Sequence, residues 1–111
     1  MERFVKGDVV VIPFPFSDLS GAKKRPALVL ASLKGDDIIL CQITSQNVKD
    51  SYALTLDNSG FNSGSLNKPS NIRPNRLFTA EKSIIIRKIG RVKEETLIAT
   101  VRKLTLILKE A

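Results

Sequence analysis

The sequence predicts a mainly β fold, a small and strongly bent antiparallel sheet or barrel followed by one C-terminal α-helix. Several short segments rich in Val, Ile and Leu are bounded by Gly, Pro, Asp or Ser, a pattern typical of strands. The last segment changes to a spacing of three and four residues, which is typical of an amphipathic helix. With 111 residues and no internal repeat, the chain predicts a single domain spanning residues 1–111.

The strand candidates alternate with turn formers from the amino terminus onwards. Between the second and the third, Gly35 supplies the positive φ that a tight turn needs, so these two segments should form a hairpin. Pro74 lacks a backbone N–H and confines its segment to an edge or a kink. The predicted strands are Asp8–Phe14, Pro26–Leu33, Asp37–Thr44, Tyr52–Leu56 as an edge strand, Ser70–Arg76 and Ile84–Arg91.

The remaining segments predict a loop, a helical turn and the terminal helix. Asp57–Ser65 is a run of turn formers and predicts a surface loop, and Thr79–Lys82 predicts a short helical turn. Glu94 and Glu95 in the first turn of the terminal helix and Lys109 in its last turn suit the helix dipole. The apolar stripe expected to pack against the sheet consists of Leu97, Val101, Leu104 and Leu108.

The charge balance favours a polyanionic partner over a neutral metabolite. Lys and Arg number 18 against 11 Asp and Glu, which gives a net charge of +7 and a pI near 9.9. A basic domain with no such partner is the alternative, because charge alone identifies no function. Function therefore has to be argued from particular residues.

Three further features of the composition exclude whole classes of function. No apolar run approaches the roughly 20 residues that span a bilayer, and the amino terminus lacks the apolar region of a secretory signal, so we expect a cytoplasmic protein. One cysteine and no histidine exclude an internal disulfide and the usual His/Cys zinc sites. We predict no metal and no cofactor, and we assign Cys41 to the core because its neighbours are apolar.

The sharpest local feature is a run of three cations at the start of the second predicted strand. Pro26 restricts the residue before it to extended backbone, so the position of Arg25 is stiff. A guanidinium can bind two phosphate oxygens together and can stabilise charge that grows on phosphorus. We assign Lys23 and Lys24 to general attraction of phosphate. An ion pair to a surface carboxylate is the alternative role for Arg25.

Thr44 and Ser45 close the third predicted strand. Because the second and third strands pair antiparallel, the start of one lies beside the end of the other, and Arg25 and Thr44 should be neighbours. An arginine beside a hydroxyl and exposed backbone N–H groups makes a plausible phosphodiester site. The alternative is that Thr44 and Ser45 only cap the backbone where the strand ends.

Two other segments supply candidates for binding a nucleic acid. The segment from Asn71 to Arg76 repeats the Arg-Pro pair, so that Arg73 and Arg76 could bind flanking phosphates, while Asn71 and Asn75 carry the edges that read bases. A solvated edge strand is the alternative. In the loop before Arg25, Asp18 could hold an arginine or act as a base. Three aromatic residues beside predicted loops could stack on a base, namely Phe14, Phe16 and Phe61.

At these residues the sequence resembles the MazF/PemK family, the toxin half of bacterial toxin–antitoxin pairs. The matching motifs are Gly7-Asp8-Val9-Val10, Arg25-Pro26-Ala27-Leu28-Val29-Leu30, Ile43-Thr44-Ser45, Ile89-Gly90-Arg91 and the closing Leu-rich helix. The resemblance implies an SH3-like barrel, a homodimer, and metal-independent, sequence-specific cleavage of single-stranded RNA. It also implies neutralisation by a partly disordered acidic antitoxin.

The family's catalytic residues can be carried over by motif. Its catalytic Arg matches Arg25 and its catalytic Thr matches Thr44, the pair already chosen from the residues. In the PemK branch an Arg two residues before an Asp takes part, and this Arg matches Arg73. The chain departs from that branch at the Asp, where it has Asn75, and it lacks the branch's histidine. An amide cannot accept a proton as a carboxylate would, so the general base is open.

The expected activity is attack of the RNA 2′-oxygen on the adjacent phosphorus, which leaves a 2′,3′-cyclic phosphate and a 5′-hydroxyl. Arg25 and Thr44 are the predicted catalytic residues. Two alternatives remain open, a nucleic-acid-binding barrel without catalysis and a toxin of the same fold that poisons a protein such as gyrase. The predicted substrate-binding residues are Lys23, Lys24, Ser45, Arg73, Asn75, Arg76, Phe16 and Asp18.

Overall fold

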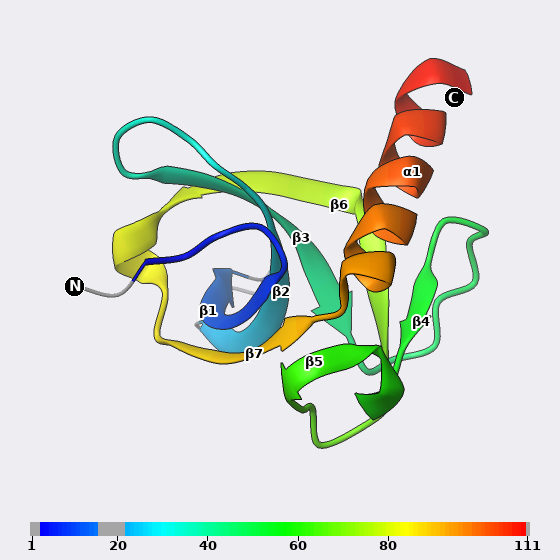
Figure 1. Ribbon diagram of the computed structural model, residues 1–111, viewed down its shortest axis with the longest axis horizontal. Helices are drawn as coiled ribbons and strands as arrows, with labels where there is room; N and C mark the ends of the chain where they lie inside the picture. Colours follow the sequence, from blue (N-terminus) through cyan, green and yellow to red (C-terminus); the bar gives the residue numbers. More distant parts are fainter. Residues whose placement is uncertain (1–2, 16–21, 111) are drawn as a thin grey trace.

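Seven antiparallel strands form one strongly curled sheet in the order β4-β6-β3-β2-β1-β7-β5, and a single α-helix follows the last strand (Figure 1). The computed structural model describes residues 3–15 and 22–110. The elements are β1 (Asp8–Pro15), β2 (Ala22–Ser32), β3 (Asp37–Thr44), β4 (Leu54–Leu56), the 3₁₀ turn η1 (Asn58–Gly60), β5 (Phe61–Gly64), β6 (Ser70–Glu81), the 3₁₀ turn η2 (Lys82–Ile84), β7 (Arg87–Val92) and α1 (Glu94–Glu110). The predicted class, a small and strongly bent antiparallel sheet or barrel with a C-terminal helix, is confirmed, and the seven strands form a half-barrel.

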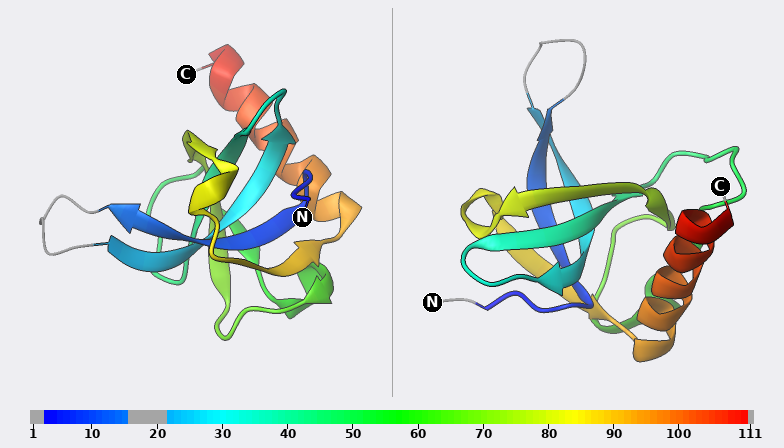
Figure 2. Two further views of the ribbon diagram at one scale, coloured as in Figure 1. Left: turned by 90° about the vertical axis from the view of Figure 1, so that its left-hand side faces the viewer. Right: turned by 90° about the horizontal axis from the view of Figure 1, so that it is seen from above.

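The central hairpin forms as predicted, but its first strand is longer than expected. β3 has the predicted bounds, and Gly35 in the turn has a φ of 79°. β2 begins at Ala22 because the basic stretch continues the ladder with β1, where Ile12 lies opposite Arg25 and Pro13 opposite Lys24. The outer ends of β1 and β2 therefore project as a two-stranded ribbon beyond the rest of the sheet (Figure 2).

Two predictions about the second half of the chain are wrong. Asp57–Ser65 is not a plain surface loop, since it contains η1 and β5, and Phe61 is only 6% exposed and packs in the core. Phe61 is therefore not available to stack on a base. The helical turn predicted at Thr79–Lys82 lies later, because β6 continues to Glu81 and the turn η2 begins at Lys82.

Pro74 lies in an interior strand, where it occupies a bulge. β6 runs between β4 and β3, so it is not an edge strand. Its register with β3 jumps from the pair Gln42 and Arg73 to the pair Cys41 and Leu77, which leaves residues 74–76 outside the ladder. A bulge needs no N–H from its extra residues, so proline is tolerated there. Of the two expected consequences of Pro74, the edge is wrong and the kink fits.

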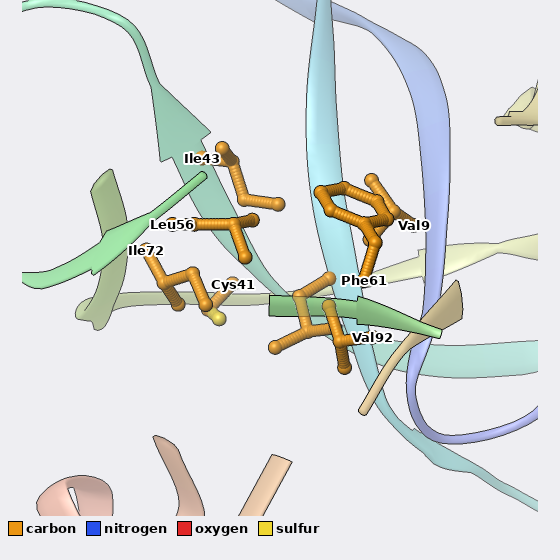
Figure 3. Close-up of a cluster of buried hydrophobic side chains, with 8 residues drawn as sticks. Val9, Cys41, Ile43, Leu56, Phe61, Ile72 and Val92 are labelled. Carbon is orange, nitrogen blue, oxygen red and sulfur yellow. The ribbon is translucent and has the colours of Figure 1, made fainter. Parts of the chain in front are cut away.

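The curled sheet buries apolar side chains on both of its faces. One face, here called the helix-side face, lies beneath α1 and carries one cluster of buried side chains (Figure 3). Its members are Val9, Leu28, Cys41, Ile43, Leu56, Phe61, Ile72 and Val92. The other, here called the far face, carries Phe4, Val10, Ile12, Ala27, Val29, Ile38 and Leu40. Because successive residues of a strand point to opposite faces, the far face takes the even positions of β3 and the odd positions of β2 as far as Val29, where the register between the two strands shifts.

The terminal helix forms as predicted, with Glu94 and Glu95 in its first turn and Lys109 in its last, but a different stripe faces the sheet. Leu97 packs against the helix-side core and Thr100 is fully buried, whereas Val101 is 43% and Leu108 is 73% exposed. The C-terminal half of α1 extends past the sheet, so residues there have little to pack against (Figure 1). No helix in the described residues combines the length and the hydropathy needed to cross a membrane.

Close packing of β5 against β7 explains one glycine of the Ile89-Gly90-Arg91 motif. A Cβ on Gly90 would lie 2.6 Å from the carbonyl oxygen of Ser63 and 2.9 Å from the ring of Phe61. Both contacts are shorter than van der Waals distance, and one of them is to backbone. Only glycine lets these two strands approach this closely.

Candidate functional site

The register of the sheet brings the main candidate residues to one end of the far face. The last pair between β2 and β3 is Ala27 with Gln42. Arg25 and Thr44 each lie two residues farther along, so they stand at the same level and on the same face. β6 continues both rows, because Gln42 pairs with Arg73 and Thr44 pairs with Asn71. Arg25, Thr44, Asn71 and Arg73 thus share one face of three neighbouring strands.

Thr44 lies where the far face meets the end of β3. Its side chain is 5% exposed, and its hydroxyl oxygen accepts a hydrogen bond from the backbone N–H of Gln46 at 3.2 Å. Thr44 therefore caps the backbone at the end of β3, which is the alternative role that the sequence analysis gives it. This bond uses a lone pair of the oxygen, so the hydroxyl proton can still be donated to a ligand. Capping and ligand binding are therefore compatible at Thr44.

A groove of about 470 Å³ opens beside Arg25, and we call it the basic groove. The start of β2 forms one wall, the end of β3 a second, and the segment between β5 and β6 a third. Thr44 and Arg73 are not among the residues that line it. The lining residues are Lys23, Lys24, Arg25, Pro26, Ile43, Ser45, Gln46, Leu66, Asn67, Lys68 and Ser70.

A second hollow, of about 310 Å³, continues the basic groove along the β1–β7 side. It shares Lys24, Arg25 and Pro26 with the first and adds Arg87 from β7. Arg25 is half-buried and lines both hollows. Arg25 therefore lies between the polar residues of the far face and the two hollows, which Lys and Arg side chains line.

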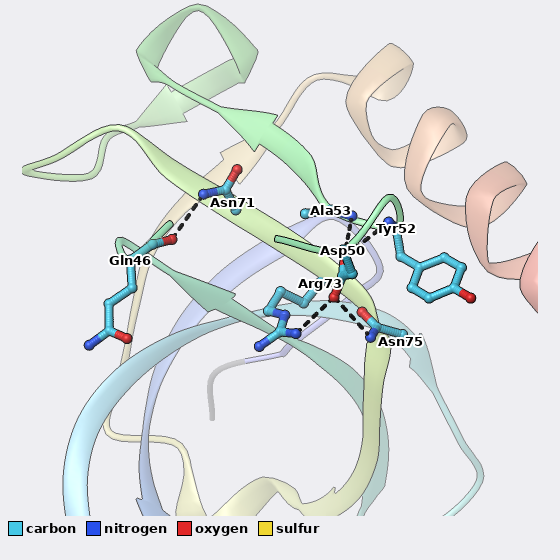
Figure 4. A network of polar contacts seen from close by, with 7 residues as sticks. All are labelled: Gln46, Asp50, Tyr52, Ala53, Asn71, Arg73 and Asn75. Atoms are coloured by element: carbon cyan, nitrogen blue, oxygen red, sulfur yellow. Dashed lines mark hydrogen bonds and ion pairs between the residues drawn. The ribbon is translucent and has the colours of Figure 1, made fainter. Parts of the chain in front are cut away.

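Arg73 is held by a carboxylate that the sequence did not single out. Its Nη2 donates to Asp50 Oδ2 at 2.9 Å, and Asn75 Nδ2 lies 3.4 Å from the same oxygen (Figure 4). The other oxygen of Asp50 accepts from the backbone N–H groups of Tyr52 at 3.0 Å and Ala53 at 3.2 Å. The Arg73 and Asp50 side chains are 19% and 26% exposed.

The surroundings of Asp50 keep it ionised. Partial burial on its own would raise the pKa of this carboxyl, but the hydrogen bonds from Tyr52, Arg73 and Ala53 and the charge of Arg73 together lower the pKa below its usual value. No local pattern marks Asp50 as a site residue, because its partners on β6 lie 23 and 25 positions away in the chain.

The remaining predicted residues lie around this centre or outside the described residues. Lys23, Lys24 and Ser45 are exposed and line the basic groove, and Asn75 and Arg76 are exposed in the bulge of β6. Phe16, Asp18 and the side chain of Phe14 lie outside the part of the chain that the structure describes. Asn67 and Lys68, which also line the groove, lie between the predicted segments, and no sequence pattern marks them as site residues.

Two residues away from the site have structural roles. Burial raises the pKa of the Cys41 thiol to about 12, so it stays neutral, and its assignment to the core is confirmed. Asp8 is 1% exposed and forms ion pairs with Lys88 and Arg91 of β7. Lys88 and Arg91 therefore tie β7 to β1.

The sequence matches the family of PemK-like, MazF-like toxins of type II toxin-antitoxin systems over residues 5–108. The chain belongs to this family. The family resemblance drawn from the motifs is thereby confirmed, and the protein is a toxin of the MazF/PemK type. A comparison with curated protein sequences finds no match.

Solved structures of MazF toxins share the fold. An endoribonuclease in complex with its cognate antitoxin, from Mycobacterial species, aligns with a TM-score of 0.74 at 14% identity, covering 98% of each chain. A MazE-MazF structure from Deinococcus radiodurans also aligns with a TM-score of 0.74, at 19% identity, covering 96% of this chain and 97% of that one. The Mycobacterium tuberculosis toxin MazF-mt6 aligns with a TM-score of 0.67 at 17% identity, covering 89% and 95%. Identities this low support the fold alone.

Proposed function

We propose that this MazF/PemK toxin is a metal-independent endoribonuclease that cleaves single-stranded RNA at specific sequences. The observation that carries the proposal is the convergence of Arg25, Thr44 and Arg73 at one end of the far face, beside a groove lined with Lys and Arg. The similarity to structures described as endoribonucleases supports the same class of reaction.

The reaction is an internal transfer at phosphorus. The ribose 2′-oxygen forms a bond to the adjacent phosphorus while the bond to the 5′-oxygen of the next nucleotide breaks. The 2′-hydroxyl loses a proton and the departing oxygen gains one, so the products are a 2′,3′-cyclic phosphate and a 5′-hydroxyl end. Negative charge accumulates on the non-bridging oxygens as the phosphorane forms, and this charge is what the protein has to stabilise.

Each candidate residue has a role that its position supports. The Arg25 guanidinium binds the phosphorane oxygens, because its planar fork can reach two of them. The Thr44 hydroxyl donates to a non-bridging oxygen. Arg73, which lies one row from Thr44 on the same face of the sheet, holds the RNA strand. No step in this scheme needs a metal ion.

The flanking residues bind the rest of the strand. Lys23, Lys24 and Ser45 line the basic groove, and Lys68 faces them from the other side. Asn75 and Arg76 project from the bulge, where their side chains are exposed to a base or a phosphate. Phe16 and Asp18 complete the proposed substrate-binding set from the sequence alone.

The proposed partners follow from the family. The protein binds a cognate acidic antitoxin, as two of the similar structures are complexes of toxin with antitoxin, and it acts as a homodimer in the cytoplasm. Its net charge of +7 suits both an acidic protein and RNA.

The test is replacement of Arg25 by alanine in an assay on a long RNA of known sequence, with EDTA in the buffer. Losing a donor that stabilises the transition state lowers a rate on the order of 10²–10³-fold, and we expect a loss of that size. End mapping should find cyclic phosphate and 5′-hydroxyl ends in the wild-type reaction.

The matched control is Lys34→Ala, which removes an exposed cation from the far turn of the same hairpin and should leave the rate unchanged. Thermal unfolding of both variants should match the wild type. Unchanged cleavage by Arg25→Ala contradicts the assignment, and retardation of RNA without cuts identifies a binding protein instead.

A further inference from the structure

The carboxylate of Asp50 is fixed before it meets Arg73. Asp50 lies in the segment between β3 and β4, and its Oδ1 accepts two backbone N–H groups, from Tyr52 and Ala53. These bonds orient the side chain so that Oδ2 faces β6 (Figure 4). The acceptor that Arg73 meets is therefore set by backbone, which makes it a rigid support.

Arg73 depends on this support. In the described part of the chain Asp50 is the one acidic side chain that pairs with Arg73, at 2.9 Å. The Nε of Arg73 is buried and makes no hydrogen bond with any described residue. A long side chain held at one point loses its orientation when that point is removed, because many rotamers then become accessible.

The pair leaves Arg73 able to bind a second anion. Asp50 accepts from Nη2, and a guanidinium carries five N–H donors, so donors remain for a phosphate. The register places Arg73 one row from Thr44 and on the same face as Arg25. An orienting carboxylate behind an arginine is an arrangement that presents the guanidinium to substrate in one direction.

We propose that Asp50 is a positioning residue of the RNA-cleaving site, which holds the Arg73 guanidinium in the direction that binds the RNA strand. The inference rests on the proposed function. Asp50 acts through Arg73 and touches neither the attacking oxygen nor the phosphorus.

The first test is Asp50→Asn. The amide oxygen can still accept the N–H groups of Tyr52 and Ala53, so the segment keeps its turn. The amide nitrogen now stands against Nη2 of Arg73, donor against donor, and the pair is lost. We expect kcat to fall about 10- to 100-fold, the size of effect that misplacement of a binding group produces. The thermal midpoint should stay close to that of the wild type.

The second test restores the carboxylate from another position. Asn75 Nδ2 lies 3.4 Å from Asp50 Oδ2, so a carboxylate at position 75 lies beside the same guanidinium. In the double variant with Asp50→Asn and Asn75→Asp, the acceptor and the donor exchange places. We expect the double variant to recover at least half of the lost kcat on a logarithmic scale.

The matched control is Asp57→Asn. The Asp57 carboxylate accepts from the N–H of Ser59 in a similar local turn, but it has no arginine partner among the described residues. This variant should cleave RNA at the wild-type rate.

The outcomes separate this inference from the proposed function. Wild-type rates in Asp50→Asn overturn it, and so does a joint loss of activity and thermal stability that Asn75→Asp does not restore. If Arg25→Ala is inactive while Asp50→Asn is fully active, the proposed function stands and the inference fails. A wild-type protein that does not cut RNA overturns both.

Discussion

Two aspartates among the described residues of this toxin pair with arginine, and they do so in contrasting places. Asp8, at the start of β1, is 1% exposed and meets Arg91 at 3.2 Å and Lys88 at 3.5 Å, both on β7. Asp50, in the segment after β3, is 26% exposed and meets Arg73 at 2.9 Å. Asp8 also accepts the N–H of Val5, as Asp50 accepts those of Tyr52 and Ala53.

The difference lies in what each pair holds. The buried pair joins the first strand to the last, 83 residues apart, so its loss weakens the contact between β1 and β7. The partly exposed pair joins Asp50, in the segment between β3 and β4, to Arg73 of the candidate site. The same chemistry thus serves the fold in one place and, as we propose, the substrate in the other. Burial separates the two roles, and mutation can test the separation.

The largest expected effect on stability belongs to Asp8. Asp8→Ala leaves the N–H of Val5 and two cations without their acceptor, and we expect a loss of about 1–3 kcal/mol in the free energy of unfolding. Asp50→Asn should unfold near the wild-type midpoint, since its amide oxygen still accepts from Tyr52 and Ala53 and the pair with Arg73 is partly exposed. Urea unfolding of both variants measures the contrast. Equal midpoints for the two variants would contradict the expectation that the Asp8 pair contributes more to stability than the Asp50 pair.

A second carboxylate beside Asp50 should move the acid side of the activity profile. In Asn75→Asp, two carboxylates share Arg73, and repulsion between like charges raises the pKa of one of them. The protonated form of that group then persists to higher pH. We expect the acid limb of kcat against pH to shift upward by on the order of one pH unit, a size typical of directly coupled groups. An unshifted profile would mean that the residue at position 75 does not reach the pair.

The smallest expected effect is the pH dependence that Asp50 gives to stability. Its pKa is lowered in the folded protein, so its contribution is complete above the unfolded pKa of about 3.9 and is lost as the pH falls through the lower folded value. The difference in urea midpoint between the wild type and Asp50→Asn should be constant from pH 5 to 8 and should shrink below pH 4. A difference that grows on acidification would contradict the direction of the shift.

Local patterns were enough to predict the parts of the fold that are local. The hairpin of β2 and β3 follows from two apolar runs around a glycine turn, and a hairpin fixes which residues face each other. For this reason the sequence alone predicts that Arg25 and Thr44 are neighbours. The helix follows from its spacing, although its spacing alone does not reveal that the sheet ends before Leu108.

Non-local pairing accounts for the parts that the sequence missed. β5 has only Phe61 as a buried side chain, and it is a strand because it pairs with β7. Its Gly- and Ser-rich sequence, taken alone, therefore predicts a loop. Asp50 reaches the site only because the chain after β3 folds back over β6. Neither contact leaves a periodic signal in the residues around it.

The bulge at Pro74 has a consequence for how such a toxin could be re-engineered. The ladder between β3 and β6 is regular on both sides of residues 74–76, so these residues are not needed to maintain the register of the two strands. Asn75 and Arg76 can be exchanged, or the bulge lengthened, without shifting the strands that carry Thr44 and Arg73. The preference for an RNA sequence could then be altered at Arg76 and in inserted bulge residues, whereas position 75, which contacts Asp50, stays reserved for the pair with Arg73.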